Sequence, residues 1–267
     1  MSAAGTPGWR PGLVALDIDG TVVDHDGKLP DAVSDAVALV VNAGVPVVLA
    51  TGRSWHSTHH IFDALGLPPG AVVCSNGAVT VRYPPQEIVK AITFDPREVI
   101  AKVEEFSPGT LIAVEEIGRG YRLSGHFPGG DLTGEMMLES VEELSARPVT
   151  RVILRDPRRS DQDFIRLAEH LGLHGVTYFV GWSAWLDIAP EGVNKATALA
   201  EIAAELGVSA ADVLAFGDGR NDIEMLSWAG RGVAIGDAPA EVQAAADVVV
   251  ETFDDGGLVR ELCHWFG

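Results

Sequence analysis

Short apolar runs that alternate with helix-like segments are the feature that most limits what this chain can fold into. Six such runs lie at residues 13–18, 45–50, 71–75, 213–216, 232–235 and 247–250. Apolar residues with helical spacing, such as Val33, Val37 and Val40, lie between them. Because strands that alternate with helices pair in parallel, the sequence predicts an α/β fold with a doubly wound, mainly parallel sheet.

The pattern changes in the middle of the chain. Between residues 83 and 187 the strand-like runs are shorter, and two expected helices, 96–106 and 161–171, separate them. We therefore predict a discontinuous core of residues 1–82 and 188–267, with an α+β domain of residues 83–187 inserted into it. The strand-like runs of the insert are 88–92, 110–115, 121–124, 149–154 and 176–180.

Unusual polar residues follow four of the predicted core strands. They are Asp17-Ile18-Asp19-Gly20-Thr21, Thr51-Gly52-Arg53, Ser75-Asn76-Gly77 and Gly217-Asp218-Gly219-Arg220-Asn221-Asp222. Ligands of open parallel sheets bind beyond the carboxyl ends of the strands, so we expect these segments to converge on one site. Residues two apart on a strand face the same side, and Asp17 and Asp19 can therefore both point at a ligand.

Three carboxylates in one site would repel one another. For Asp17, Asp19 and Asp218 the cost is roughly 4 kcal/mol per pair at 4 Å and an effective dielectric constant near 20. A hard divalent cation removes this conflict, and oxygen ligands without a nearby His or Cys favour Mg²⁺. A single Asp at a strand end often only caps a turn, but the joint placement favours a metal site.

These segments resemble the four motifs of the haloacid dehalogenase superfamily. The motifs are Asp17-Ile18-Asp19-Gly20-Thr21, Thr51, Lys195, and Gly217-Asp218 through Asn221-Asp222, in that order. The insertion between Thr51 and Lys195 resembles the Cof-type branch with its α/β cap. The resemblance implies a Rossmann-like core and a magnesium-dependent phosphatase that acts on a small phosphorylated metabolite, such as a sugar phosphate.

The resemblance also implies the chemistry of the acidic residues. Asp17 would be the nucleophile that forms an aspartyl phosphate, which divides one difficult displacement into two easier ones. Asp19 would act as the general acid and then as the general base. The metal ligands would be Asp17, the backbone carbonyl of Asp19, and Asp218, while Asp222 would support the metal site by holding phosphate or metal-bound water.

The phosphate-binding residues implied by the resemblance are Thr51, Gly52, Lys195 and Asn221, and weaker substrate contacts are Gly20, Arg53 and Asn76. Thr51 is equally suited to be an ordinary N-cap. A lysine in the first turn of a helix, as expected for Lys195, opposes the macrodipole by roughly 0.3–1 kcal/mol unless an anion lies beside it. A bound phosphate and the carboxylates would supply that anion.

Two other groups of residues suggest weaker hypotheses. His56, His59 and His60 share one helical face, but no acidic or cysteine ligand is adjacent, so an exposed helix face is favoured over a metal site. Four aromatic residues of the insert could line a substrate pocket or belong to its core. They are Tyr121, His126, Trp182 and Trp185.

Other functions are less well supported. A phosphomutase of the same superfamily is the main alternative enzyme, and a non-catalytic protein that binds a phosphometabolite is an alternative of another class. A dehalogenase is disfavoured because family dehalogenases lack the second Asp, which is present here as Asp19. The formal net charge of −19 argues against nucleic-acid binding.

Location and assembly are predicted from composition. No apolar stretch has the length of a membrane span or a signal peptide, so we expect no membrane association. The two cysteines, Cys74 and Cys263, fit a reducing and therefore cytoplasmic location. We expect a monomer or a weak homodimer.

Overall fold

A computed structural model describes residues 8–171, 176–180 and 185–267. Its core is a five-stranded sheet in the order β14-β13-β12-β1-β2, with every neighbouring pair parallel. The strands are β1 (Leu13–Leu16), β2 (Val47–Leu49), β12 (Val213–Gly217), β13 (Arg231–Ala234) and β14 (Val248–Val249). The predicted parallel core sheet is confirmed for five of the six predicted strands, and the sixth, the run at 71–75, lies in another sheet.

Helices cover both faces of this sheet because its apolar side chains alternate in direction. Val14 and Leu16 pack in one hydrophobic cluster, and Leu13 and Ala15 pack in another on the opposite face. The first cluster includes α1 (Asp31–Asn42), α2 (Trp55–Ala64) and α9 (Gly257–Phe266), and the second includes α6 (Lys195–Glu205), α7 (Ile223–Trp228) and α8 (Ala240–Ala245). This two-sided burial explains the uninterrupted apolar sequence of β1.

A three-stranded antiparallel sheet adjoins the core sheet. Its strands are β3 (Gly70–Cys74), β4 (Val79–Tyr83) and β5 (Glu87–Ala91). β3 touches the end of β2 in parallel at one bridge, Ala50 to Val73, but its ladder is with β4. The run at 88–92, predicted in the insert, corresponds to β5 and pairs with β4.

The turn between β3 and β4 reverses the chain through left-handed backbone. Ser75 and Asn76 have φ angles of 51° and 54°, and Gly77 has a φ of 100°. A Cβ at Gly77 would lie 2.2 Å from the carbonyl oxygen of Asn194. The glycine therefore allows this turn to lie directly against the start of α6.

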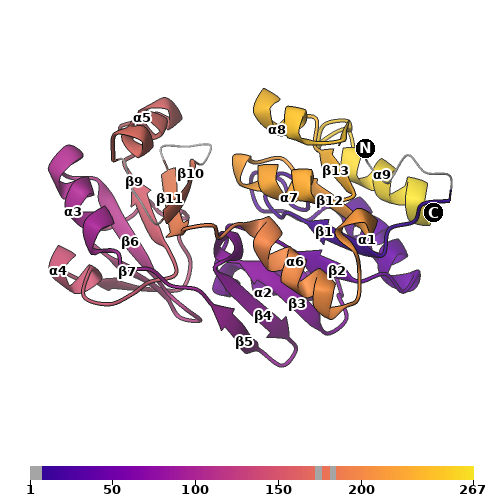
Figure 1. Ribbon diagram of the computed structural model, residues 1–267, viewed down its shortest axis with the longest axis horizontal. Helices are drawn as coiled ribbons and strands as arrows, with labels where there is room; N and C mark the ends of the chain where they lie inside the picture. The colour runs from indigo at the N-terminus through magenta and orange to yellow at the C-terminus, as the bar shows by residue number, and fades with distance from the viewer. Residues whose placement is uncertain (1–7, 172–175, 181–184) are drawn as a thin grey trace.

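A six-stranded sheet with three helices forms a separate lobe, at the left of Figure 1. Its strand order is β10-β11-β9-β6-β7-β8, antiparallel except for β7 and β8. The elements are β6 (Leu111–Glu116), β7 (Gly120–Leu123), β8 (Glu135–Leu138), β9 (Val152–Arg155), β10 (Val176–Val180), β11 (Trp185–Pro190), α3 (Arg97–Phe106), α4 (Val141–Leu144) and α5 (Asp161–Leu171). The helices pack on one face of this sheet, and its other face is turned toward the candidate site.

No helix within the described ranges combines the length and the apolar content needed to cross a bilayer. Cys74 is buried, Cys263 is exposed, and both are free thiols. The cytoplasmic location and the oligomeric state stay predictions.

Candidate active site

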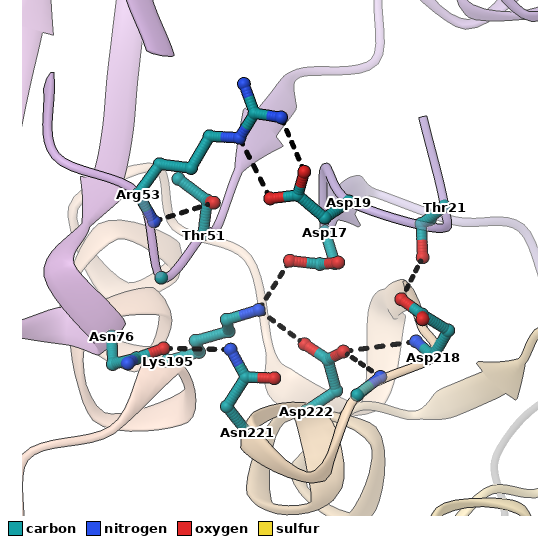
Figure 2. Close-up of polar contacts among 12 residues, drawn as sticks. Asp17, Asp19, Thr21, Thr51, Arg53, Asn76, Lys195, Asp218, Asn221 and Asp222 are labelled. Carbon is teal, nitrogen blue, oxygen red and sulfur yellow. Dashed lines mark hydrogen bonds and ion pairs between the residues drawn. The ribbon is translucent and has the colours of Figure 1, made fainter. Parts of the chain in front are cut away.

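The carboxyl ends of β1 and β12 bring Asp17 and Asp218 together, as the sequence predicts (Figure 2). Asp17 directly follows β1, and its N–H donates to the carbonyl of Phe216 at 3.0 Å. One carboxylate oxygen from each of Asp17, Asp218 and Asp222 lies within 4.8 Å of the others, and all three residues are buried. We call these residues, together with Lys195, the acidic cluster. Its all-oxygen donor set could hold a metal ion.

Lys195 joins the two halves of the core at this point. It is the first residue of α6, which Asn194 and Thr197 begin with a reciprocal capping box. The ammonium donates to Asp17 Oδ1 at 2.5 Å and to Asp222 Oδ1 at 2.7 Å, and the residue is 0% exposed. The two carboxylates thus supply the anion that a lysine in the first turn of a helix requires.

Asp222 holds the loop that carries Asp218. Its Oδ2 accepts hydrogen bonds from the N–H groups of Asp218 and Gly219, at 3.1 and 2.9 Å, while its Oδ1 faces Lys195. On the opposite side, Asp218 Oδ1 accepts from the Thr21 hydroxyl at 3.3 Å. Each Asp222 oxygen therefore has protein donors, which suits a supporting position better than a direct metal ligand.

Burial and the closeness of the charges shift the pKa values of residues in the acidic cluster. Burial, with the charge of Asp222, raises the pKa of Asp17 well above its usual range, although Lys195 opposes the shift. The same two causes raise the pKa of Asp218 to about 7. Burial opposes the charged form of Lys195, but Asp17 and Asp222 raise its pKa. The cluster thus has more negative charge than Lys195 alone can neutralise, which is the condition that favours a bound cation.

Magnesium should therefore raise the melting temperature more at pH 8 than at pH 5.5. A carboxyl whose folded pKa of about 7 exceeds the unfolded value of about 3.9 destabilises the metal-free fold increasingly as pH rises between these values. A cation offsets the repulsion of the ionised cluster, and at lower pH it must compete with protons. Thermal unfolding in EDTA and in Mg²⁺ measures the gain. An equal gain at both pH values would contradict this charge arrangement.

Asp19 lies apart from the acidic cluster. Its carboxylate forms a two-pronged ion pair with Arg53, with Nε to Oδ2 at 2.8 Å and Nη2 to Oδ1 at 2.5 Å (Figure 2). The Asp19 side chain is 57% exposed. Asp19 and Arg53 both line the same cavity as Asp17, the candidate nucleophile.

Thr51 is buried and does not cap the following helix. The N-cap of α2 is Ser54, while the Thr51 hydroxyl accepts the backbone N–H of Arg53 at 3.1 Å. Nearby, the Asn221 amide donates to Asn76 Oδ1 at 2.9 Å. Gly52 packs against this pair, because a Cβ there would lie 3.1 Å from Asn76 Oδ1. Three of the candidate phosphate-binding residues, Thr51, Gly52 and Asn221, are thus adjacent.

A cavity of about 510 Å³ opens above the cluster, between the core and the six-stranded sheet. From the core it is lined by Asp17, Asp218 and Asn221, among others, and from the sheet by Tyr121, Arg151, Trp185 and Asp187. Of the four residues that the sequence suggests for a substrate pocket, Tyr121 and Trp185 line this cavity. His126 is exposed, and Trp182 lies outside the described residues. Of the histidines on α2, His56 and His60 are exposed.

Sequence reasoning missed Arg151 and Asp187. Each is a buried charged residue within or next to an apolar strand, which is the only signal that could have marked them. Their partners are distant in the chain and no motif joins them.

Comparisons with known proteins give the family context. A family model described as haloacid dehalogenase-like hydrolase matches residues 14–262. Phosphoglycolate phosphatase of Methanoculleus marisnigri is 28% identical and is matched over 95% of this chain and 96% of its own length. Pyridoxal phosphate phosphatase YbhA of Escherichia coli is 30% identical, with 89% and 92% covered.

Solved structures support the fold. BT1666 of Bacteroides thetaiotaomicron, a phosphatase of the HAD superfamily, has a TM-score of 0.80 at 26% identity, with 97% of this chain and 96% of that chain covered. The subclass IIB sugar phosphatase BT4131 has a TM-score of 0.81 at 22% identity, with 95% and 98% covered. The predicted fold class, a Rossmann-like α/β core with an inserted α+β cap, is confirmed.

Proposed function

Because this chain belongs to the family of haloacid dehalogenase-like hydrolases, we propose that it is a magnesium-dependent phosphatase that hydrolyses a small phosphorylated metabolite through an aspartyl phosphate on Asp17. The names of its relatives support phosphatase chemistry, and the resemblance to the Cof-type branch is confirmed. The observation that carries the proposal is the buried acidic cluster at the floor of the cavity.

Asp17 has the surroundings of a nucleophile. Lys195 binds Oδ1, which leaves Oδ2 available to attack phosphorus and keeps the carboxylate oriented. The new bond forms between Oδ2 and phosphorus as the bond from phosphorus to the leaving oxygen breaks. Lys195, Thr51 and Asn221 would bind the phosphate oxygens, where positive charge and hydrogen-bond donors stabilise the transferring group.

A magnesium ion fits the donors that the cluster offers. We propose Asp17, the carbonyl of Asp19, and Asp218 as its protein ligands, with Asp222 holding the Asp218 loop. When bound, Mg²⁺ would offset the carboxylate repulsion and polarise a phosphoryl oxygen. These residues offer oxygen ligands only, which is the set that Mg²⁺ prefers.

Asp19 is proposed to move protons in both half-reactions. It would donate one to the leaving alkoxide and later accept one from the water that attacks the aspartyl phosphate. In the structure it pairs with Arg53, whose side chain is 22% exposed, and this two-pronged ion pair must open for the transfer.

Asp19→Ala should therefore slow alkyl phosphate hydrolysis more than aryl phosphate hydrolysis. A loss of about 10²- to 10⁴-fold is expected for an alkyl substrate, because its alkoxide needs a proton. p-Nitrophenolate leaves without one, so the first step with p-nitrophenyl phosphate should be less affected. Single-turnover rates with both substrates measure the difference. Equal losses would remove the general-acid assignment.

The substrate is proposed to be a sugar phosphate or a similarly small phosphate monoester. The cavity of about 510 Å³ is in the range of small-molecule sites. We propose that residues 83–187 form the cap that closes over it and that Tyr121 and Trp185 contact the leaving group. Both lie on the cavity side of the six-stranded sheet.

A phosphorylated-metabolite panel with Mg²⁺ tests the function directly. Release of inorganic phosphate without a bisphosphate activator is the expected result. Transfer of the phosphoryl group to another hydroxyl only in the presence of such an activator would identify a phosphomutase instead. Saturable binding of a phosphometabolite without turnover would identify the non-catalytic alternative.

A further inference from the structure

We propose that Arg151 is a positioning residue, which from the cap side of the cavity sets the geometry of the phosphate-binding groups. It directly precedes β9 and is buried, with 3% of its surface exposed. The proposal rests on the proposed function, because it assumes that Thr51 and Asn221 bind phosphate. It adds that their orientation depends on the cap and not on the core alone.

The first connection runs from Arg151 to the Thr51 hydroxyl. The guanidinium Nη1 donates to the carbonyl oxygen of Gly52. The N–H of the same peptide unit belongs to Arg53 and donates to Thr51 Oγ1 at 3.1 Å. Figure 2 shows this second hydrogen bond. Because Oγ1 already accepts this bond, its own proton is left to donate to a phosphate oxygen. A charged donor on the carbonyl polarises the peptide and strengthens the second bond.

The second connection runs through Asp187 to Asn221. Asp187 lies on β11, and its Oδ2 accepts a hydrogen bond from the Asn76 amide at 3.3 Å. Asn76 Oδ1 in turn accepts from the Asn221 amide at 2.9 Å (Figure 2). Asp187 Oδ2 is 3.8 Å from Arg151 Nη1. Both connections therefore start at the same buried ion pair.

Other buried groups hold Arg151 in place. Its Nη2 donates to the Tyr121 hydroxyl at 2.6 Å, and its Nε is 3.8 Å from Glu115 Oε2. The same Glu115 oxygen accepts the Ser75 hydroxyl at 2.6 Å, which ties it to the turn that carries Asn76. We call Thr51-Gly52-Arg53 the phosphate loop. Three segments of the cap thus contact the core: Glu115 on β6 contacts Ser75, Arg151 before β9 contacts the phosphate loop, and Asp187 on β11 contacts Asn76.

Arg122 provides a matched control in the same sheet. It is also buried and lies on β7, where its guanidinium faces Glu116 and Glu139, at 3.2 and 2.9 Å. Its partners Glu116, Glu139 and the carbonyl of Glu143 all lie within the cap lobe, and it does not line the cavity. Substitution of Arg122 therefore removes a buried arginine from the cap without removing a bond to the phosphate loop.

Arg151→Met and Arg122→Met separate positioning from general stability of the cap. For Arg151→Met we expect the inhibition constant of inorganic phosphate to rise, and kcat/KM for p-nitrophenyl phosphate to fall, by about tenfold each. For Arg122→Met both values should stay within about threefold of the wild type. Circular dichroism and gel filtration establish that each variant is folded. Equal effects of the two substitutions would overturn the proposal.

A double-variant cycle tests the route through Thr51. If Arg151 acts mainly by orienting the Thr51 hydroxyl, Arg151→Met should weaken phosphate binding much less in a Thr51→Val background than in the wild type. A full, additive loss in that background would overturn the route.

Arg151→Lys keeps the test decisive should the methionine variant fail to fold. It retains the charge that Glu115 and Asp187 require, but a single ammonium cannot replace the guanidinium fork at both Gly52 and Tyr121. We expect at least a threefold rise in the phosphate inhibition constant, and a wild-type value would overturn the role of the fork. The proposed function fails separately, if the wild type releases no phosphate from any substrate.

Discussion

Asp17→Asn lowers kcat by about 10⁴-fold or more and leaves the protein folded. The loss is this large because removal of a nucleophile usually leaves only the catalysis supplied by binding and electrostatics. The amide has nearly the same shape as the carboxylate, and its oxygen can still accept the bond from Lys195 Nζ. It also removes one negative charge from a crowded buried cluster. Rapid-quench and steady-state phosphate release measure the effect.

The folded state of Asp17→Asn is part of this prediction. Because repulsion with Asp222 and Asp218 is reduced, its melting temperature in EDTA should equal or exceed that of the wild type. Asp35→Asn, at an exposed position on α1, is the matched control and should keep wild-type activity. Turnover by Asp17→Asn at a rate near that of the control would refute the nucleophile assignment.

Lys195→Met is expected to cause the largest loss of stability. The ammonium is fully buried between Asp17 and Asp222, at 2.5 and 2.7 Å, so its removal leaves two buried carboxylates without their cation. Breaking a buried ion pair by removal of one partner costs about 3–5 kcal/mol. Urea unfolding in EDTA measures this cost, and activity should be lost as well.

Lys90 gives a control with the same contact distances. Its ammonium lies 2.5 and 2.7 Å from the two oxygens of Glu201, but the side chains are 39% and 54% exposed. Lys90→Met should therefore cost only about 0–1 kcal/mol. A similar loss in the free energy of unfolding for both substitutions would show that burial does not make the Lys195 ion pairs more stabilising than the exposed pair of Lys90.

Much of the site follows from a simple rule about parallel strands. Asp17 and Asp218 are far apart in the chain, yet their positions at strand ends were enough to predict that they meet, whereas only the family resemblance placed Lys195 beside them. Asp19 lines the same cavity as Asp17 although β1 stops at Leu16, but its carboxylate pairs with Arg53 and does not join the acidic cluster, which the strand-end rule could not predict.

Pairing between distant segments was the part that could not be predicted. The run at 71–75 has the apolar sequence of a parallel strand, and only the left-handed turn at Ser75 and Asn76 directs it into an antiparallel ladder with β4. Arg151 and Asp187 depend on pairing in the same way. Their contacts reach Gly52 and Asn76, about 100 residues away, and local periodicity contains no information on such contacts.

β1 lies between β12 and β2 in the core sheet, so it cannot pair on both sides until a late part of the chain has been made. Leu13 pairs with Val213, so one edge of the first strand waits for a partner synthesised about 200 residues later. At about 5–20 residues per second, a ribosome needs roughly 10–40 s to supply β12. During that time an apolar strand edge is open to wrong partners. The nascent chain already contains Asp17 but not Lys195, so the acidic cluster can be completed only after Asp222 has been synthesised.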